Sequence, residues 1–173
     1  MAWLLQKNAE IRERAESGEL CLGTIDSWLL WQLTQEHVFK TDYSNASRTQ
    51  LMNLQTLGWD EELAEIFGIP MECLPQICDS DSVFGYTLMG GLFEKPVPIC
   101  AVLGDSHAAL FGQGCLLPGM SKATYGTGSS LMMNIGEKPI ASSHGVVTSL
   151  AWKRRGRVEY VLEGNLNYTG AVI

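Results

Sequence analysis

The amino-acid sequence predicts an α/β protein, and two features of its second half support this. Residues 97–103 form a continuous apolar run of strand length, as expected of a buried strand, and a helical pattern follows at 106–113. From residue 121 onward, apolar stretches alternate with Gly-containing turns, which is typical of β-hairpins. One such turn is expected at Arg155-Gly156. We place a domain boundary between these textures, near residues 114–120.

The beginning of the chain is predicted to be helical. Residues 3–17 carry apolar side chains among charged ones, and Gly18 follows as a stop signal. A second helix is expected over the apolar run 28–33, directly after Asp26 and Ser27. The segment before the domain boundary is therefore expected to begin with a helical layer.

A strand, a bend and a further helix are expected next. Residues 37–43 alternate between polar and apolar side chains, which predicts a strand, and the polar residues 44–49 predict a bend. Residues 60–67 have acidic side chains in their first turn and are followed by Gly68 and Pro70. This arrangement is typical of a short helix with clear ends.

Composition limits the possible classes of protein. The 173 residues include 46% hydrophobic side chains and carry a formal net charge of −7, which favours a globular protein and argues against nucleic-acid binding. No apolar run approaches the roughly 20 residues that span a bilayer, and the start lacks the layout of a signal peptide. We therefore expect a cytoplasmic protein without membrane partners. Helical patterns run into both ends, the second at residues 170–173, so we also expect an internal fragment.

The tryptophans, histidines and cysteines, and two further aspartates, are expected to have structural roles. Trp28, Trp31 and Trp59 are expected in the core, and Asp79 and Asp81 in a turn. The histidines lack the spacing of metal ligands, so no metal site is expected. The cysteines form no C-x-x-C pair and have mostly apolar neighbours, so we expect reduced core thiols at Cys21, Cys73, Cys78, Cys100 and Cys115.

Asp105 is the first candidate for chemistry, because it lies where the apolar run 97–103 gives way to a helix. Ligands of open α/β sheets bind beyond the carboxyl ends of strands, and a carboxylate there can accept a proton from a substrate hydroxyl. Phosphoryl transfer needs little more than such a base and good positioning. The alternative, which local physics favours, is that Asp105 only caps the helix. A hydrolase triad with Ser106 and His107 is a weaker alternative, because neighbours in sequence rarely reach triad geometry.

The second candidate is the turn Gly126-Thr127-Gly128. Two glycines around a threonine allow a tight turn that presents backbone N–H groups and a hydroxyl to a phosphate. An ordinary hairpin turn is the alternative. The chain contains neither a Walker-type loop nor a G-x-G-x-x-G string, so these phosphate-binding motifs have no support.

Several strings, in this order along the chain, resemble the FGGY family of carbohydrate kinases, and most closely its glycerol kinases. The matching strings are GTIDSWLLWQLT (23–34), TDYSNASRT (41–49), LGWDEEL and IFGIP (57–70), GDSHAALFGQG (104–114), YGTGSS (125–130), NIGEKP (134–139) and LEG with TG (162–170).

The resemblance implies an actin-like, ribonuclease-H-type fold of two domains, with ATP and substrate between them. Residues 1–116 would be the C-terminal part of the first, substrate-side domain, and residues 117–173 the opening β-hairpins of the second, nucleotide-side domain. ATP would bring Mg²⁺ with its phosphates, and the partner would be a small polyol or sugar. The resemblance is compatible with a homo-oligomer as well as with a monomer.

The resemblance also implies roles for individual residues. Asp105 matches the catalytic base, which also binds the polyol, and Thr127 matches a nucleotide phosphate contact within the turn that Gly126 and Gly128 form. Gly170 matches a glycine that lies against the nucleotide.

Two substrate-binding positions, Ser106 and Ser130, depart from the glycerol kinase pattern, which has Gln at the first and an aromatic residue at the second. Loss of the aromatic ring opens space and adds a hydroxyl, which would suit a four- or five-carbon substrate better than glycerol. The alternatives are a kinase for a larger sugar such as a pentulose, and a noncatalytic sugar- or nucleotide-binding sensor of the same fold. The isolated chain is expected to be inactive.

Overall fold

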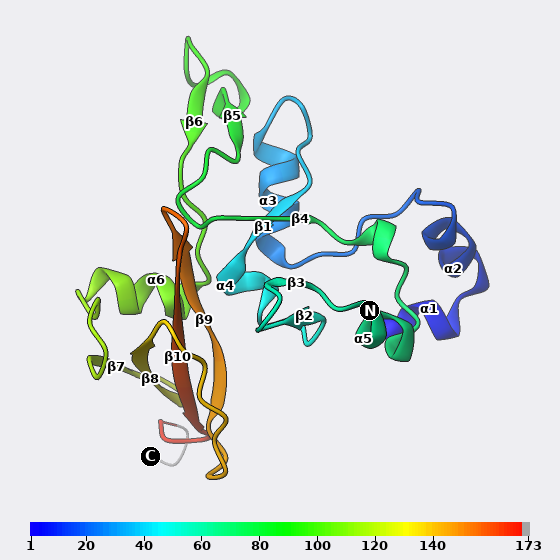
Figure 1. Cartoon of the computed structure of the whole chain (residues 1–173). Coiled ribbons are helices and arrows are strands. Elements are labelled where there is room, and N and C mark those ends of the chain that lie inside the picture. The colour runs from blue at the N-terminus through cyan, green and yellow to red at the C-terminus, as the bar shows by residue number, and fades with distance from the viewer. Residues whose placement is uncertain (171–173) are drawn as a thin grey trace.

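The structure is a computed structural model that describes residues 1–170, so the end of the helix expected at 170–173 lies outside the described residues. The helices are α1 (Ala2–Lys7), α2 (Ala9–Glu16), α3 (Ile25–Leu33), α4 (Tyr43–Ala46), α5 (Glu61–Phe67) and α6 (Asp105–Gly112), with 3₁₀ turns at Met71–Cys73 and Met89–Gly91. The strands are β1 (Lys40–Asp42), β2 (Met52–Asn53), β3 (Gly58–Trp59), β4 (Gln76–Cys78), β5 (Gly85–Thr87), β6 (Val97–Ile99), β7 (Ser121–Tyr125), β8 (Ser129–Gly136), β9 (Val147–Arg154) and β10 (Arg157–Leu166). Helices α1, α2 and α5 gather near the N-terminus, and the long strands lie at the other end (Figure 1).

The single helix expected over residues 3–17 is wrong, because the chain breaks into α1 and α2 at Asn8. Asn8 adopts an extended backbone conformation, with φ −132° and ψ 108°, and its side-chain oxygen accepts a hydrogen bond from the Ile11 N–H at 3.1 Å. Asn is a strong N-cap residue, since its side chain satisfies a backbone donor that would otherwise lack a partner. The apolar periodicity continues across the break and conceals it, while α2 ends just before Gly18 as predicted.

Helix α3 confirms the second predicted helix but begins earlier, so that Asp26 and Ser27 lie within its first turn and are buried. The core placement of two tryptophans is wrong: Trp28 and Trp31 are 56% and 37% exposed. The helix is apolar nearly all round, and its buried residues are Asp26, Ser27 and Leu30, while Trp31 stacks on His37 at its C-terminal end. Trp59 is half-buried, and its indole N–H donates to the Pro75 carbonyl at 2.8 Å.

The strand expected at 37–43 is confirmed only for β1, which pairs in parallel with β4. The bend expected at 44–49 instead opens with the short helix α4. Its N-cap is Asp42, whose carboxylate accepts from the backbone N–H groups of Ser44 and Asn45, both at 3.0 Å. A capping carboxylate at the end of a strand thus turns the chain into a helical turn. Helix α5 agrees with the helix expected at 60–67.

The buried strand expected at residues 97–103 is wrong. Only β6 is a strand; it pairs with β5 in an antiparallel two-stranded ribbon that projects from the body, and Val97 is exposed (Figure 1). A continuous apolar run becomes a buried strand only where layers cover both faces of a sheet, and here the segment around Thr34 packs against β5, while Val97 of β6 stays exposed. The predicted helix after it is confirmed as α6.

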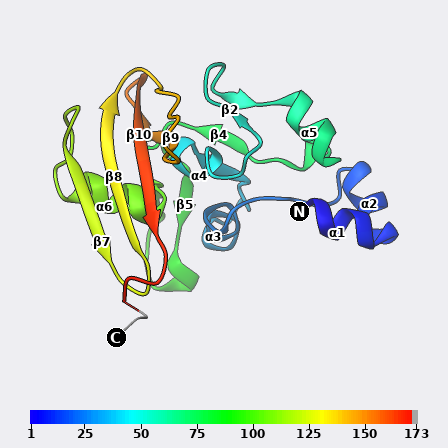
Figure 2. The same ribbon diagram turned by 90° about the horizontal axis from the view of Figure 1, so that it is seen from below.

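The predicted β-hairpins are confirmed as a four-stranded antiparallel sheet in the order β7-β8-β10-β9. At the turn between β9 and β10, Arg155 and Gly156 have φ values of 51° and 75°. These left-handed conformations are those of the tight hairpin turns that match strand twist. Helix α6 lies across one face of the sheet (Figure 2). Leu110 of this helix is buried together with Met132, Trp152 and Val161 of the strands.

Two hydrophobic clusters contain residues from both sides of the domain boundary predicted at residue 116. In the first, Leu110 packs with Met132 and Val161, and in the second, Tyr43 packs with Leu150. A third cluster is confined to the first part of the chain, around Leu5, Ala15, Leu51, Ile69 and Cys73. The boundary itself stays a prediction.

All the cysteines are free thiols, but their expected core placement is only partly right. Cys73 and Cys115 are buried, Cys78 is half-buried, and Cys21 and Cys100 are exposed. Over residues 1–170, none of the helices has the length and hydropathy of a membrane-spanning segment. Within the same range, His, Cys, Asp and Glu side chains nowhere gather in threes that could hold a metal ion.

Candidate active site

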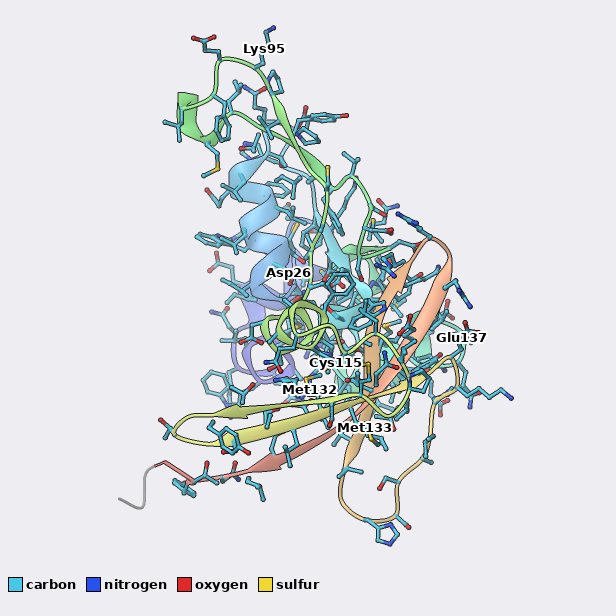
Figure 3. The ribbon with its side chains drawn as sticks, turned by 90° about the vertical axis from the view of Figure 1, so that its left-hand side faces the viewer. Asp26, Lys95, Cys115, Met132, Met133 and Glu137 are labelled. Atoms are coloured by element: carbon cyan, nitrogen blue, oxygen red, sulfur yellow. The ribbon has the colours of Figure 1, made fainter. Side chains whose placement is uncertain are left out.

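A pocket of ≈ 490 Å³ surrounds the N-terminus of α6. Its walls come from the first turn of α3, the segment after β1, the N-terminal turn of α6 and strand β10. The lining residues are Ile25, Asp26, Leu29, Asn45, Arg48, Leu103, Gly104, Asp105, Ser106, His107 and Glu163. Figure 3 shows Asp26 at the base of α3. The pocket therefore collects polar side chains from segments that are far apart in sequence.

Asp105 is the first residue of α6, and its side chain is exposed in this pocket. Gly104 holds the N-cap position without a side-chain cap, so Asp105 is not the N-cap residue, although its carboxylate still satisfies one backbone donor of the first turn. The Asp105 Oδ1 accepts from the backbone N–H of the next residue, Ser106, at 2.6 Å. This contact orients the carboxylate at the positive end of the helix and leaves its other oxygen directed to the surroundings. Ser106 lines the same pocket.

His107 lies beside Asp105 in the wall of the pocket but is only 3% exposed. The pKa of His107 is lowered to about 4, and burial is the largest cause. The positive charges of Arg48 and Lys122 also lower this pKa, whereas the Asp105 carboxylate raises it. Within residues 1–170, the His107 Nε2 has no hydrogen-bond partner. A neutral, buried imidazole does not fit the hydrolase alternative well, because its low pKa makes it a weak general base.

An ion pair closes the pocket on the side of the sheet. Arg48 donates to the Glu163 Oε2 at 2.7 Å, and the Glu163 side chain is almost fully buried. The Ser130 hydroxyl donates to the other oxygen of Glu163 at 3.4 Å. Ser130 is thus placed behind Glu163 and is absent from the lining of the pocket itself. The structure brings Asp105 and Ser106 into one pocket and leaves Ser130 one contact away.

Sequence reasoning missed several polar residues of this pocket: Asp26, Asn45, Arg48 and Glu163. Asp26 and Arg48 have charged side chains next to apolar or small residues, and Glu163 follows the apolar pair Val161 and Leu162 in β10. A charge in an apolar strand was the available signal for Glu163, because such a charge is stable only when it is paired. The identity of its partner, Arg48, could not be deduced from the neighbouring residues in the sequence.

The turn Gly126-Thr127-Gly128 lies at a second, smaller pocket of ≈ 240 Å³, lined by Tyr125, Gly126, Ser129, Thr169 and Gly170. The Gly170 N–H donates to the Thr127 carbonyl at 3.2 Å. A Cβ on Gly170 would collide with the carbonyl of Gly126, so only glycine permits this approach. The structure therefore joins the predicted nucleotide-side residues in one place, while Thr127 and Gly128 stand at the edge of the pocket. The two pockets have no lining residue in common.

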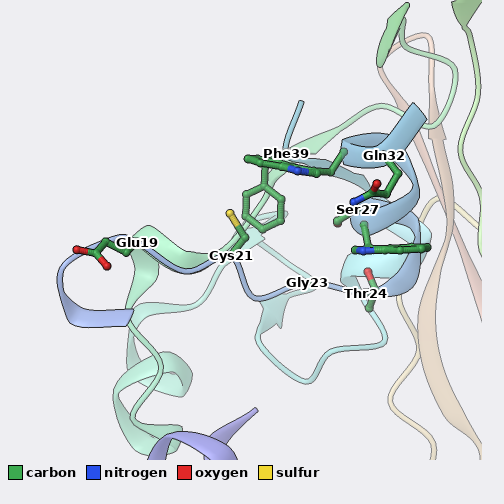
Figure 4. A pocket seen from close by; sticks show the side chains of 9 residues that line it. Glu19, Cys21, Gly23, Thr24, Ser27, Gln32 and Phe39 are labelled. Carbon is green, nitrogen blue, oxygen red and sulfur yellow. The ribbon is translucent and has the colours of Figure 1, made fainter. Parts of the chain in front are cut away.

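A third pocket, of ≈ 490 Å³, lies beside α3 and is lined by Trp28, Trp31, Phe39 and Cys21 among others (Figure 4). None of the residues that the sequence marked for chemistry lines it. The pocket around Asp105 is therefore the better candidate site.

Comparison with known proteins gives consistent matches. Residues 1–112 match the model of the N-terminal domain of the FGGY family of carbohydrate kinases. Glycerol kinase 1 of Thermotoga maritima is 53% identical over 171 residues, which cover 99% of this chain and 35% of that protein. The crystal structure of Plasmodium falciparum glycerol kinase with ADP superposes with a TM-score of 0.93 at 37% identity, covering 98% of this chain and 34% of that chain. A ligand-bound xylulose kinase of Lactobacillus acidophilus, at 24% identity and a TM-score of 0.74, covers 86% of this chain and 30% of its own, and shares the fold. The chain thus spans about a third of the length of these relatives.

Proposed function

The chain belongs to the FGGY family of carbohydrate kinases, and on this premise we propose that its parent protein transfers a phosphoryl group from ATP to a hydroxyl of a small polyol or sugar. The observation that carries this proposal is the Asp105 carboxylate. It is exposed in a polar pocket, and only one of its oxygens, Oδ1, accepts a hydrogen bond from the backbone, at the Ser106 N–H. The glycerol kinase relatives support the same reaction class.

In the proposed reaction, Asp105 accepts the proton of the attacking hydroxyl. The reaction needs a positioned base more than a strong one, because the transition state of phosphoryl transfer is loose. Ser106 and Asn45, which line the pocket next to Asp105, offer hydrogen bonds to further hydroxyls of the substrate. Arg48 lies in the same wall, where its guanidinium, paired with Glu163 at 2.7 Å, has further N–H donors for substrate oxygens.

On the nucleotide side, the turn Gly126-Thr127-Gly128 is proposed to contact the phosphates of ATP, and Gly170 to lie against the nucleotide. The close approach of Gly170 to Gly126 supports this role, since a surface without side chains lets a ligand reach the backbone. Mg²⁺ would arrive with the nucleotide phosphates. The glycerol kinase of Plasmodium falciparum, which superposes on this chain, was crystallised with ADP.

The substrate is proposed to be larger and more hydroxylated than glycerol. Arg48 and Glu163 form a polar wall of the pocket, and Ser130 hydrogen-bonds Glu163 from behind this wall, at a position where an aromatic residue would bring apolar surface instead. A polar wall favours substrates that bring more hydroxyls, because each unpaired polar group in a closed site costs binding free energy. A four- or five-carbon polyol or sugar fits this wall best.

Asp105→Asn in the complete protein tests the proposed reaction. We expect kcat for ADP formation to fall at least about 100-fold, while MgATP binding stays within about twofold, because the amide keeps the shape but cannot accept the proton. Asp81→Asn, in the turn after β4, is the matched control and should keep full activity.

The same experiment separates the alternatives. ADP formation that depends on added polyol excludes a hydrolase. Ligand binding without turnover in the unmodified protein would favour a sensor and contradict the proposal.

A further inference from the structure

Asp42 is a buried carboxylate that no step of the proposed reaction uses. Its side chain is fully buried, at 0% exposure, and each of its two oxygens accepts hydrogen bonds from neighbouring residues. Oδ2 accepts from the Ser44 N–H at 3.0 Å and the Ser80 hydroxyl at 2.7 Å. Oδ1 accepts from the Ser44 hydroxyl at 2.9 Å, from the Asn45 N–H at 3.0 Å and from the Asn45 side-chain amide at 2.8 Å. A carboxylate held in this way can move only if several neighbours move with it.

Ser44 connects this carboxylate to the turn that carries Asp105. Its hydroxyl donates to Asp42 and accepts from the backbone N–H of Gly104 at 2.8 Å, although Ser44 and Gly104 are 60 positions apart in sequence. The directions of both bonds are fixed, because a hydroxyl has one proton and a backbone N–H can only donate. Gly104 is the N-cap residue of α6 and directly precedes Asp105.

From this geometry we infer that Asp42 and Ser44 are positioning residues, which hold the Gly104-Asp105 turn at the angle that aims the proposed base into the pocket. The inference rests on the proposed function, since it assigns Asp105 the role of base. Asn45, which hydrogen-bonds the same carboxylate, itself lines the pocket. One buried group thus holds both a pocket-lining amide and the turn before Asp105, and small displacements of a base are costly to turnover.

Ser80 offers a matched comparison with Ser44. Both hydroxyls donate to Asp42. Both residues are buried: Ser80 is 4% exposed and Ser44 is 0% exposed. The Ser80 hydroxyl accepts from the backbone N–H of Lys153 in β9, at 3.3 Å, and not from the turn before Asp105. Removing either hydroxyl takes one hydrogen bond from Asp42, but only the Ser44 change frees Gly104.

The test compares Ser44→Ala with Ser80→Ala in the complete protein. Steady-state kinetics with MgATP and the best polyol should show kcat at least tenfold lower for Ser44→Ala and within twofold of wild type for Ser80→Ala. Both variants should lower the melting temperature similarly, and KM for MgATP should stay within twofold. Hydrogen–deuterium exchange at the Gly104 amide should accelerate at least tenfold in Ser44→Ala alone. Ser44→Cys, which keeps a similar volume and a weaker acceptor, should fall between wild type and Ser44→Ala and covers the case in which Ser44→Ala does not fold.

Equal losses of kcat in Ser44→Ala and Ser80→Ala, or unchanged exchange at Gly104, would overturn the inference. If the wild-type protein phosphorylates no polyol or sugar, the proposed function fails instead. The exchange measurement then still decides whether Ser44 holds the Gly104 turn, so the two failures can be told apart.

Discussion

His107 shows at the residue scale how a neighbour of the proposed base responds to its surroundings. The imidazole is buried beside Asp105, and burial is the main cause of its lowered pKa. Arg48 and Lys122 lower the pKa of His107 further, because a third positive charge near these two cations is unfavourable. The pocket therefore contains a histidine that stays neutral where an exposed histidine would titrate.

This lowered pKa predicts how stability depends on pH. Between about pH 6.5 and about pH 4 the unfolded chain binds a proton at His107 that the folded chain does not, so the free energy of unfolding falls as pH falls through this window. The slope from this group is at most about 1.4 kcal/mol per pH unit, and it vanishes above the window. Urea unfolding at a series of pH values should show this component for wild type and not for His107→Gln. The control His144→Gln changes an exposed loop and should keep the pH dependence of wild type. The same pH dependence of the free energy of unfolding in wild type and in His107→Gln would contradict the assignment of this component to His107.

Ser130 allows a prediction about substrate choice. We expect the complete wild-type protein to have a higher kcat/KM for a four- or five-carbon polyol than for glycerol, measured over a polyol panel. Ser130→Phe should shift the ratio toward glycerol by about tenfold, because the ring adds apolar surface and fills space next to Glu163. Ser143→Phe, in the exposed loop before β9, should leave the ratio unchanged. A tenfold or greater preference of the wild type for glycerol would refute the larger-substrate proposal.

At the scale of single elements, local chemistry explains where most elements begin and end. Asn8, Asp42 and Asp60 each occupy an N-cap position with a side-chain hydrogen bond to the backbone. The break at Asn8 was predictable from its residue type, yet the apolar pattern on either side concealed it. By contrast, the residues around Val97 have the composition of a buried strand and lie in an exposed ribbon, because burial depends on what packs against a strand.

The turn between β9 and β10 provides a prediction at this scale. Arg155 adopts a left-handed conformation, with φ 51°, that Asn tolerates better, and its own backbone N–H bonds Asp81 without using the side chain. Arg155→Asn should therefore raise the free energy of unfolding by about 0.5 kcal/mol, whereas Gly156→Ala should lower it by about 1 kcal/mol. Denaturant unfolding of both variants measures these changes, and effects of the same sign would contradict the turn assignment.

At the scale of the whole molecule, the expected actin-like, ribonuclease-H-type fold is confirmed by the family match and by the superposition on solved kinases. The residues assigned to polyol and nucleotide lie in two pockets without a shared wall. The chain covers about a third of the length of its relatives.

The isolated 173-residue chain is accordingly expected to bind MgATP weakly and to have no kinase activity. Isothermal titration with MgATP should give a dissociation constant well above the micromolar range, since few phosphate contacts are available to offset the entropy lost on binding. The complete protein, titrated in parallel, is the positive control. Submicromolar affinity of the isolated chain would show that these contacts suffice for nucleotide binding.

By itself, the sequence determined the family, the helix expected over residues 106–113, the hairpins and the glycine turn at Thr127. These features depend on motifs and on backbone preferences that act over a few residues. Only the tertiary structure decided that Arg48 pairs with Glu163 and that Ser44 hydrogen-bonds Gly104. Such contacts join residues that are far apart in the chain and are brought together only by the fold, so no local pattern encodes them.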